Sequence, residues 1–137
     1  MPSGSRHYRV TLADALGAHD RALRTGGRSG IKDLNDILSA IGRPYSGYHR
    51  SIASKAAALM QSVATNHGFI DGNKRTAIIL TELLLEQSGY TLAPVDKSEK
   101  LNDAIEEFVV GIVNREYSFD KIFDWYKSRI RKLEHKA

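Results

Sequence analysis

The chain contains no cysteine among its 137 residues. Without thiols it can form neither a disulfide framework nor a thiolate metal site, and it has no cysteine nucleophile. This composition fits a reducing cytoplasm, where we expect the protein to act. No apolar run is long enough to span a bilayer, and no apolar signal segment opens the sequence, so we expect no association with a membrane.

The chain also lacks a strong excess of charge, since its formal net charge is only +4. A mild positive balance suits an anionic ligand such as a nucleotide, or an acidic partner. It falls short of the dense basic field of a dedicated DNA-binding protein. A basic cluster near the C-terminus has no aromatic or Gly-rich RNA signature, so we interpret it as the solvated end of the last helix and expect no direct nucleic-acid binding. This cluster comprises Lys127, Arg129, Arg131, Lys132 and Lys136.

The length predicts one domain over residues 1–137, with residues 1–5 frayed. Apolar residues recur mainly at helical spacing, which predicts an all-α fold. The helix expected from near Asn73 to Gly89 is apolar on nearly all sides at its centre, so we expect it to be the central buried helix. Six helices are predicted over residues 11–23, 33–41, 51–66, 73–89, 96–114 and 118–133, with caps at Thr11, Asp33, Ser51, Ser118 and the Asp96–Glu99 pair.

The most informative stretch lies between the third and fourth expected helices and reads "NHGFIDGNKRTA" over residues 66–77. Asp71-Gly72 is a turn dipeptide and Asn73 is a good N-cap residue, so backbone N–H groups of residues 73 to 76 are expected at an open helix end. Such an end binds anions. Lys74 and Arg75 oppose the helix macrodipole there, but they would converge with it on a phosphate.

The same loop carries an acid and a base. Asp71 can bind Mg²⁺, which commonly takes one or two carboxylates plus phosphate oxygens. His67 suits a general base near neutral pH, and Phe69, Ile70 or both can anchor the loop in the core. Each residue type alone more often has a structural role. Their combination in one short loop favours phosphoryl or nucleotidyl transfer, which requires positioning and charge neutralisation.

The stretch "HGFIDGNKR", residues 67–75, resembles the signature of the Fic/Doc superfamily, His-x-Phe-x-Asp/Glu-Gly/Ala-Asn-Gly/Lys-Arg. Lys74 and the continuation "RTA" resemble the Doc, or death-on-curing, branch. "RTGGRSGIKD", "SKAAALM" and "LLLEQSGY" are also similar to Doc sequences, so the resemblance spans roughly Leu12 to Leu92 and, less distinctly, the last two helices.

The resemblance implies a compact bundle in which the motif loop leads into the central helix. It also implies a short flap beside the active site that aligns a protein target by strand addition. We expect this flap, a loop or hairpin, at about residues 26–33, with "GRPYSGYHR", residues 42–50, as the alternative.

The activity implied by the resemblance is transfer of part of ATP to a Ser or Thr hydroxyl of a protein. His67 would deprotonate that hydroxyl, and Asp71 would bind Mg²⁺. Asn73 and the backbone amides from Gly72 to Arg75 would form the anion cradle. Lys74 and Arg75 would contact the phosphates, with Arg75 also counted among the catalytic residues.

Two departures distinguish the branches. Relatives that transfer AMP typically have Gly after the Asn and a second Arg three residues past the first, where this chain has Lys74 and Ile78. The resemblance therefore favours a Doc-type toxin, an Mg-ATP-dependent kinase that phosphorylates elongation factor Tu and arrests translation. AMP transfer and a non-catalytic, antitoxin-binding protein are the alternatives. Gly68 stands where many relatives have Pro, which we expect to loosen the loop slightly.

Many Fic proteins carry an inhibitory helix with a Ser/Thr-x-x-x-Glu signature, which this sequence lacks. The resemblance implies control by a separate, Phd-like antitoxin whose C-terminal segment folds as a helix against the toxin. The first helix and its neighbours could supply the groove for that helix. Its own apolar residues Leu12, Leu16 and Leu23 are expected to lie in the core.

Overall fold

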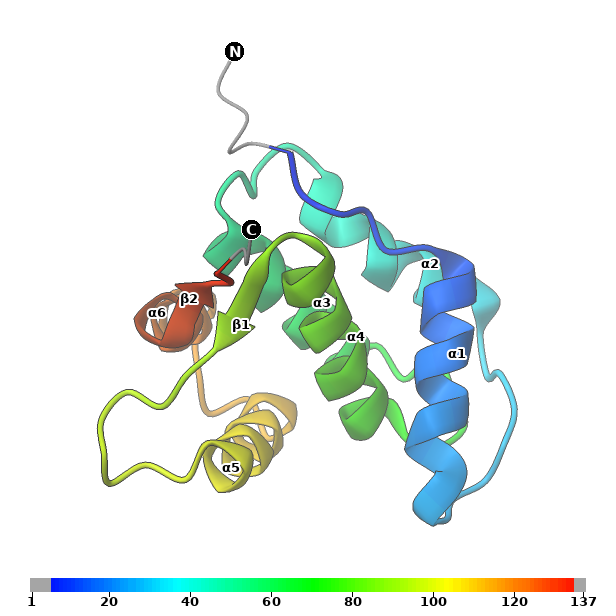
Figure 1. Ribbon diagram of the computed structural model, residues 1–137. Coiled ribbons are helices and arrows are strands. Elements are labelled where there is room, and N and C mark those ends of the chain that lie inside the picture. The colour runs from blue at the N-terminus through cyan, green and yellow to red at the C-terminus, as the bar shows by residue number, and fades with distance from the viewer. Residues whose placement is uncertain (1–5, 135–137) are drawn as a thin grey trace.

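In the computed structural model, which describes residues 6–134, helices α3 and α4 lie between α1 and α2 on one side and α5 and α6 on the other (Figure 1). The predicted all-α class is confirmed, with one small antiparallel sheet in the described part of the chain. None of the helices in this part is both long and apolar enough to cross a membrane. The α-helices are α1 (Leu12–Ala22), α2 (Leu34–Gly42), α3 (Ile52–Thr65), α4 (Asn73–Gln87), α5 (Leu101–Val113) and α6 (Phe119–Arg129), the 3₁₀ turns are Leu23–Thr25 and Arg43–Tyr45, and the strands are β1 (Tyr90–Leu92) and β2 (Ile130–Lys132).

Short polar side chains start four of these helices, as predicted. Thr11 accepts a hydrogen bond from the backbone N–H of Asp14, whose carboxylate accepts one from the N–H of Thr11, and this reciprocal pair is a capping box. Asp33 caps α2, Ser51 caps α3 and Ser118 caps α6 in the same manner.

The most deeply buried helix is α3, not the α4 expected from the sequence. Ten of its residues are buried, against six in α4. Ala56, Ala57 and Ala58 are fully buried, and such small side chains let α2, α4, α5 and α6 all pack closely around α3. The larger apolar residues of α4 cover the core from one side and leave Glu82 exposed.

The buried face of α1 is also different from the expected one. It consists of Ala15, Ala18, His19 and Ala22, whereas Leu16 is 38% exposed. Leu12 and Leu23 are only partly buried. The expectation that the leucines of α1 form the core is therefore wrong for Leu16, because small residues bring α1 close to α4.

The fifth helix begins later than predicted. Asp96 accepts hydrogen bonds from the backbone and side chain of Ser98, and Glu99 accepts one from the N–H of Val95. These bonds close a turn, and α5 starts only at Leu101. The Asp96–Glu99 pair therefore stabilises the turn before α5 instead of capping the helix.

The last helix ends at Arg129, four residues before the predicted end, because residues 130–132 pair with β1. The Arg129 guanidinium forms an ion pair with Glu99 at 2.6 Å and lies 4.1 Å from the centre of the Trp125 ring. The interpretation of the basic cluster as a solvated helix end is therefore wrong for Arg129, while Arg131 and Lys132 belong to β2. Lys136, like the segment 1–5, lies outside the described residues.

A close contact in α5 gives a test of the packing. A Cβ on Gly111 would lie 2.7 Å from the Cζ atom of Tyr117 and 2.9 Å from its hydroxyl. Gly111→Ala must displace that ring, so we expect a loss of about 1–3 kcal/mol in the free energy of unfolding, measured by chemical denaturation. Gly17→Ala in α1 is the control, because nothing lies within 4 Å of its Cβ, and we expect it to add ~0.5–1 kcal/mol. Unchanged stability of Gly111→Ala would contradict the tight contact.

Candidate functional site

The loop between α3 and α4 is closed by the side chain of Asn73. Its Oδ1 accepts a hydrogen bond from the Phe69 N–H at 3.1 Å, and its Nδ2 donates one to the Phe69 carbonyl at 3.0 Å. Asn73 is therefore not the N-cap predicted from the sequence. That position belongs to Gly72, whose left-handed backbone, with φ of 79°, favours glycine.

The N-terminal end of α4 is open, as predicted. The Thr76 N–H bonds to the Gly72 carbonyl at 2.9 Å, so the N–H groups of Asn73, Lys74 and Arg75 come before the first hydrogen bond of the helix. They lie at a cleft of about 590 Å³ between this helix end, the turn after α1 and the end of α5. The lining residues are Thr25, Gly26, Gly27, Ala64, His67, Ile70, Asp71, Gly72, Asn73, Lys74, Arg75 and Val113.

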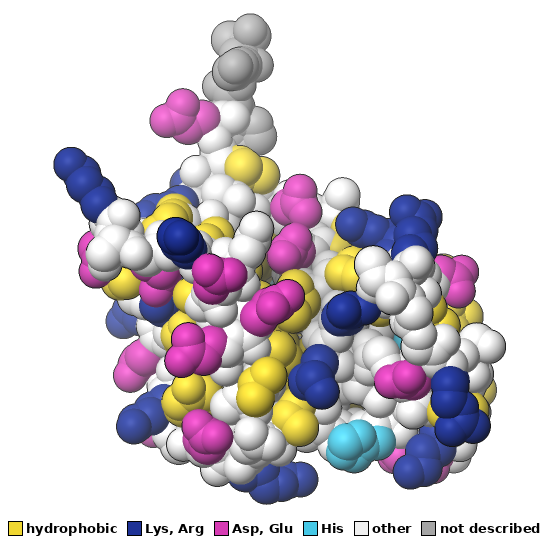
Figure 2. All heavy atoms as spheres, turned by 90° about the horizontal axis from the view of Figure 1, so that it is seen from below, with side chains coloured by type: hydrophobic (Ala, Val, Ile, Leu, Met, Phe, Trp, Pro, Cys, Tyr) yellow, Lys and Arg dark blue, Asp and Glu magenta, His cyan; other side chains and the backbone are white. Residues whose placement is uncertain are grey.

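Six of the seven predicted site residues therefore line one cleft, and Phe69 is buried beneath it at 2% exposure. His67, Lys74 and Arg75 are exposed, and the Arg75 guanidinium donates a hydrogen bond to the Thr25 hydroxyl. Figure 2 shows the molecule from below. Most acidic side chains lie on the half that contains α5 and α6, and a His side chain is exposed on the other half. The molecule thus gathers a histidine, a carboxylate, two cations and a helix end around one cleft.

The Asp71 carboxylate is held by two backbone groups. Its Oδ2 accepts a hydrogen bond from the Arg28 N–H at 3.0 Å, and its Oδ1 accepts one from the Gly72 N–H at 2.8 Å. The bond from Arg28, then that from Gly72, lowers the pKa of Asp71, and the charges of Arg28 and Lys74 lower it further. The carboxylate is therefore ionised at neutral pH.

This carboxylate fits the way proteins bind Mg²⁺. Each of its oxygens uses one acceptor site for a backbone N–H and retains another. Among residues 6–134, no three His, Asp or Glu side chains gather into a metal-binding group. A magnesium ion at Asp71 would then take its other ligands from phosphate oxygens and water, as is usual for this ion.

A residue that the sequence analysis missed, His19, attaches the loop to α1. Its Nε2 lies 2.8 Å from the Asp71 carbonyl oxygen, so Nε2 carries the proton and donates. Its ring stacks on Phe69, with centroids 3.9 Å apart and planes 9° apart. The available signal was its spacing, because His19 lies on the same helical face as Ala15, Ala18 and Ala22.

The segment 26–33, the expected flap, lies beside the motif loop. Ile31 pairs with Phe69 in an isolated antiparallel bridge, and the Ile70 N–H donates to the Gly30 carbonyl at 3.0 Å. The alternative location, residues 42–50, instead contains the 3₁₀ turn Arg43–Tyr45. Neither segment forms a hairpin of its own in the described structure.

Gly68 lies in close contact with α2, and its expected loosening of the loop relative to Pro stays a prediction. Its carbonyl accepts hydrogen bonds from the N–H groups of Lys32 and Asp33. A Cβ at this position would lie 2.5 Å from the Cγ1 of Ile37 and 3.1 Å from its backbone nitrogen. The missing side chain therefore lets α2 approach the loop closely.

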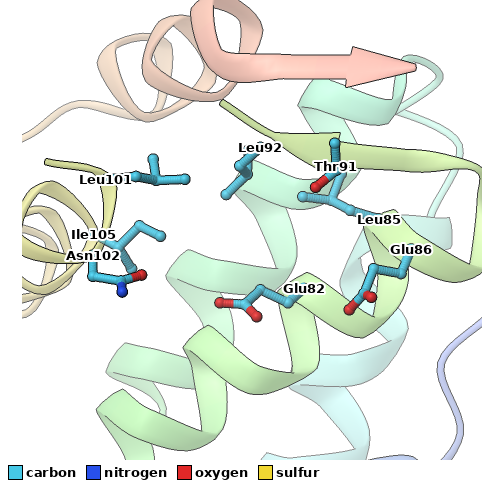
Figure 3. A pocket seen from close by; sticks show the side chains of 8 residues that line it. All are labelled: Glu82, Leu85, Glu86, Thr91, Leu92, Leu101, Asn102 and Ile105. Carbon is cyan, nitrogen blue, oxygen red and sulfur yellow. The ribbon is translucent and has the colours of Figure 1, made fainter. Parts of the chain in front are cut away.

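Another cavity, of about 230 Å³, lies at the opposite end of α4, against β1 and the start of α5 (Figure 3). Glu82 and Glu86 line it together with apolar side chains and no Lys or Arg. Glu82 is exposed as a whole residue, but partial desolvation of its carboxylate raises its pKa, and the neighbouring Glu86 raises it further. Two carboxylates disfavour a phosphate there, so the cleft at the motif loop is the better site for an anionic ligand.

Comparisons with known proteins identify relatives of this chain. The family model described as "Fic/DOC family" matches residues 9–85. The protein named "Toxin Doc" from Mycolicibacterium smegmatis (strain ATCC 700084 / mc(2)155) is 36% identical in an alignment of 88 residues, and this alignment covers 58% of this chain and 68% of that protein. The matched residues of the family model contain the whole motif loop and most of α4.

The hydrogen bonds to Asp71 predict how the loop responds to acid. Because they lower the pKa of Asp71 in the folded protein, the contact with Arg28 is complete above the ordinary aspartate value of 3.8 and is lost as pH falls through the lower folded value. We expect the amide NMR signal of Arg28 to titrate with a midpoint below 3.8. In Asp71→Asn this titration should disappear. A midpoint above 3.8 in the unmodified chain would contradict the contact.

The contacts of His19 predict a role in holding the loop. His19→Phe retains a ring against Phe69 but removes the donor to the Asp71 carbonyl, so we expect a loss of about 1 kcal/mol in the free energy of unfolding. Amide hydrogen exchange between Gly68 and Gly72 should become faster. Arg131→Ala is the control, because this exposed residue of β2 lies away from the loop and should change stability by less than ~0.5 kcal/mol. Unchanged loop exchange in His19→Phe would show that stacking alone holds the loop.

Proposed function

The chain belongs to the Fic/Doc family, and from this membership we propose that it is a Doc-like toxin of a toxin–antitoxin system that uses Mg-ATP to phosphorylate a protein hydroxyl. One observation carries the proposal. Lys74 and Arg75 lie at the open end of α4, in one cleft with His67 and Asp71. We also propose that residues 1–137 form a single Fic/Doc domain, because the core of the described residues is one cluster from Val10 to Tyr126. The resemblance to Doc toxins supports a site of action in the cytoplasm.

The helix end and the two cations bind the phosphates of ATP in this proposal. The N–H groups of Asn73, Lys74 and Arg75 point along the helix axis and favour negative charge. The side chains of Lys74 and Arg75 add charge-assisted hydrogen bonds. Asp71 would hold Mg²⁺, which neutralises phosphate charge when bound, and the bond from Arg28 keeps this carboxylate ionised and oriented.

His67 acts as the general base. It takes the proton of the target Ser or Thr hydroxyl, whose oxygen forms a bond to the γ-phosphorus as the bond to the β–γ bridging oxygen breaks and ADP leaves. The exposed position of His67 on the cleft supports this role, since a protein substrate must reach it. The segment 26–33 borders the same cleft through Gly26 and Gly27, which suits a flap that aligns the target.

Lys74 and Ile78 support the proposal that the γ-phosphoryl group is transferred. Ile78 is partly buried and packs against the core, so no cation stands where relatives that transfer AMP have their second Arg. Lys74 occupies space that Gly leaves open in those relatives. Both features support transfer of the γ-phosphoryl group, and the resemblance to Doc supports elongation factor Tu as the target.

The antitoxin surface is proposed on α1, α2 and the segment before α2. Four apolar residues of these elements are each 38–45% exposed: Leu16, Ile31, Leu34 and Leu38. Apolar side chains exposed together on neighbouring elements favour an interaction surface. A Phd-like antitoxin would lay the apolar face of its C-terminal helix there, which is a common mode of recognition.

Labelled ATP tests the activity. We expect elongation factor Tu incubated with the protein to take up label from the γ-phosphate and none from the α-phosphate. His67→Ala should reduce this transfer by about 100-fold or more, as expected on removal of a general base. Label from the α-phosphate would instead establish AMP transfer. No label from either, with His67→Ala still arresting growth, would favour a protein that acts by binding alone.

The phosphate contacts are tested by Arg75→Ala with Arg131→Ala as its matched control. We expect Arg75→Ala to abolish transfer while the melting temperature stays close to that of the unmodified chain. Removing a cation from a helix N-terminus relieves ~0.3–1 kcal/mol of unfavourable dipole energy, which offsets the lost bond to Thr25. Arg131 is exposed on β2, away from the cleft, and its replacement should leave transfer unchanged.

A further inference from the structure

A second group of basic side chains surrounds a cavity at the N-terminal end of α3. The cavity has a volume of about 350 Å³ and is lined by Tyr45, Gly47, His49, Arg50 and Lys55. It lies at the opposite end of α3 from the motif loop, which follows the last residue of that helix. No Asp or Glu occurs between Asp36 and Asp71, so the whole segment that forms this cavity is free of carboxylates.

Lys55 is buried, and no described carboxylate forms an ion pair with it. Its side chain is only 8% exposed, and its Nζ lies 2.8 Å from the Nδ1 of His7 and 6.0 Å from the centre of the Tyr45 ring. The ion pair found among residues 6–134 is that of Arg129 with Glu99, so no carboxylate in this part of the chain lies within 4.0 Å of the Lys55 ammonium. Burial lowers the pKa of Lys55. A buried ammonium group of this kind is stabilised strongly by an anion that enters from solvent.

The other groups around the cavity add positive charge and donors. Arg50 is exposed at its rim, and the Nδ1 of His49 lies 2.7 Å from the Ser54 hydroxyl. Burial and the charge of Arg43 lower the pKa of His49. Lys55 itself lies in the first turns of α3, where a cation is unfavourable to the helix macrodipole, as at Lys74 in α4. A bound anion would compensate the buried positive charge of Lys55 and offset its unfavourable interaction with the macrodipole of α3.

We propose that this cavity is an oxyanion site that binds a phosphate group between the Lys55 ammonium and the Arg50 guanidinium, separately from the cleft at the motif loop. A lysine supplies a point charge and an arginine can bind two phosphate oxygens at once. The ligand is inorganic phosphate, pyrophosphate or the terminal phosphate of a small ester. The proposal does not depend on the transferase function, because none of its residues belongs to that cleft.

NMR signals of the histidine rings distinguish phosphate binding at the cavity from phosphate binding at the cleft. Inorganic phosphate is added to the purified chain, with the His49 ring reporting on the cavity and the His67 ring on the cleft. We expect the His49 signal to shift saturably, with a Kd on the order of 1 mM. Arg75→Ala should remove the phosphate response of His67 and leave that of His49 unchanged.

Two variants test the residues named. Arg50→Gln changes an exposed side chain and should weaken the His49 response by about tenfold, as should Lys55→Met, which retains the apolar stem. Arg131→Gln is the matched control and should leave the response unchanged. Because Arg50 is exposed, its variant remains informative if Lys55→Met does not fold.

Three results would overturn the proposal. The first is a His49 signal that does not move with phosphate or pyrophosphate. The second is a response that is equal in Arg50→Gln and the unmodified chain. The third is a response only to a short single-stranded oligonucleotide, which would assign the surface to nucleic acid, with the 90% exposed Tyr48 beside it as a base-stacking residue.

Discussion

The candidate site depends on how Phe69 is held. Its ring is buried against His19, its backbone N–H and carbonyl both bond to the side chain of Asn73, and it pairs with Ile31. These contacts join α1, the segment before α2 and the start of α4 at one residue of the loop. Because Phe69 is fixed, His67 and Asp71 on either side of it project into the cleft from a loop that has little freedom to rearrange.

Helices α3 and α4 each carry a cation within their first four residues, Lys55 in α3 and Lys74 in α4, where the macrodipole disfavours positive charge by ~0.3–1 kcal/mol at exposed sites. In α4 the cations are exposed beside Asp71, whereas in α3 Lys55 is buried and forms no ion pair with a described carboxylate. A cost of this size is readily offset by binding an anion through charge-assisted hydrogen bonds. Our proposals place an anion at both helix ends, where it would supply the negative charge that these cations lack.

Much of the fold could be predicted from the sequence, because its signals act over short distances. Thr11, Asp33, Ser51 and Ser118 each cap a helix through hydrogen bonds that reach only two or three residues ahead. The same reasoning was wrong for Asn73, because its side chain forms hydrogen bonds with the backbone of Phe69 in the preceding loop instead of capping α4. It also missed β2, whose partner strand lies about forty residues earlier in the chain.

The central position of α3 shows why hydrophobicity alone did not predict which helix is the most deeply buried. Leu and Ile residues made α4 the expected centre, yet a helix of small residues can be approached from more sides. The gathering of the motif residues in one cleft was predicted because they lie within one loop. The support that α1 gives this loop through His19 was not predicted, because its bond to Asp71 spans 52 residues.

The sequence by itself determined where most helices begin and which acid, base and cations share the loop before α4. Caps, turns and charges within a few residues of one another decide these features. Only the tertiary structure decided that His19 holds the loop, that Gly68 admits α2 and that Lys55 is a buried cation at a cavity. Each of these depends on the approach of elements distant in the chain, and such contacts arise only when the core is packed.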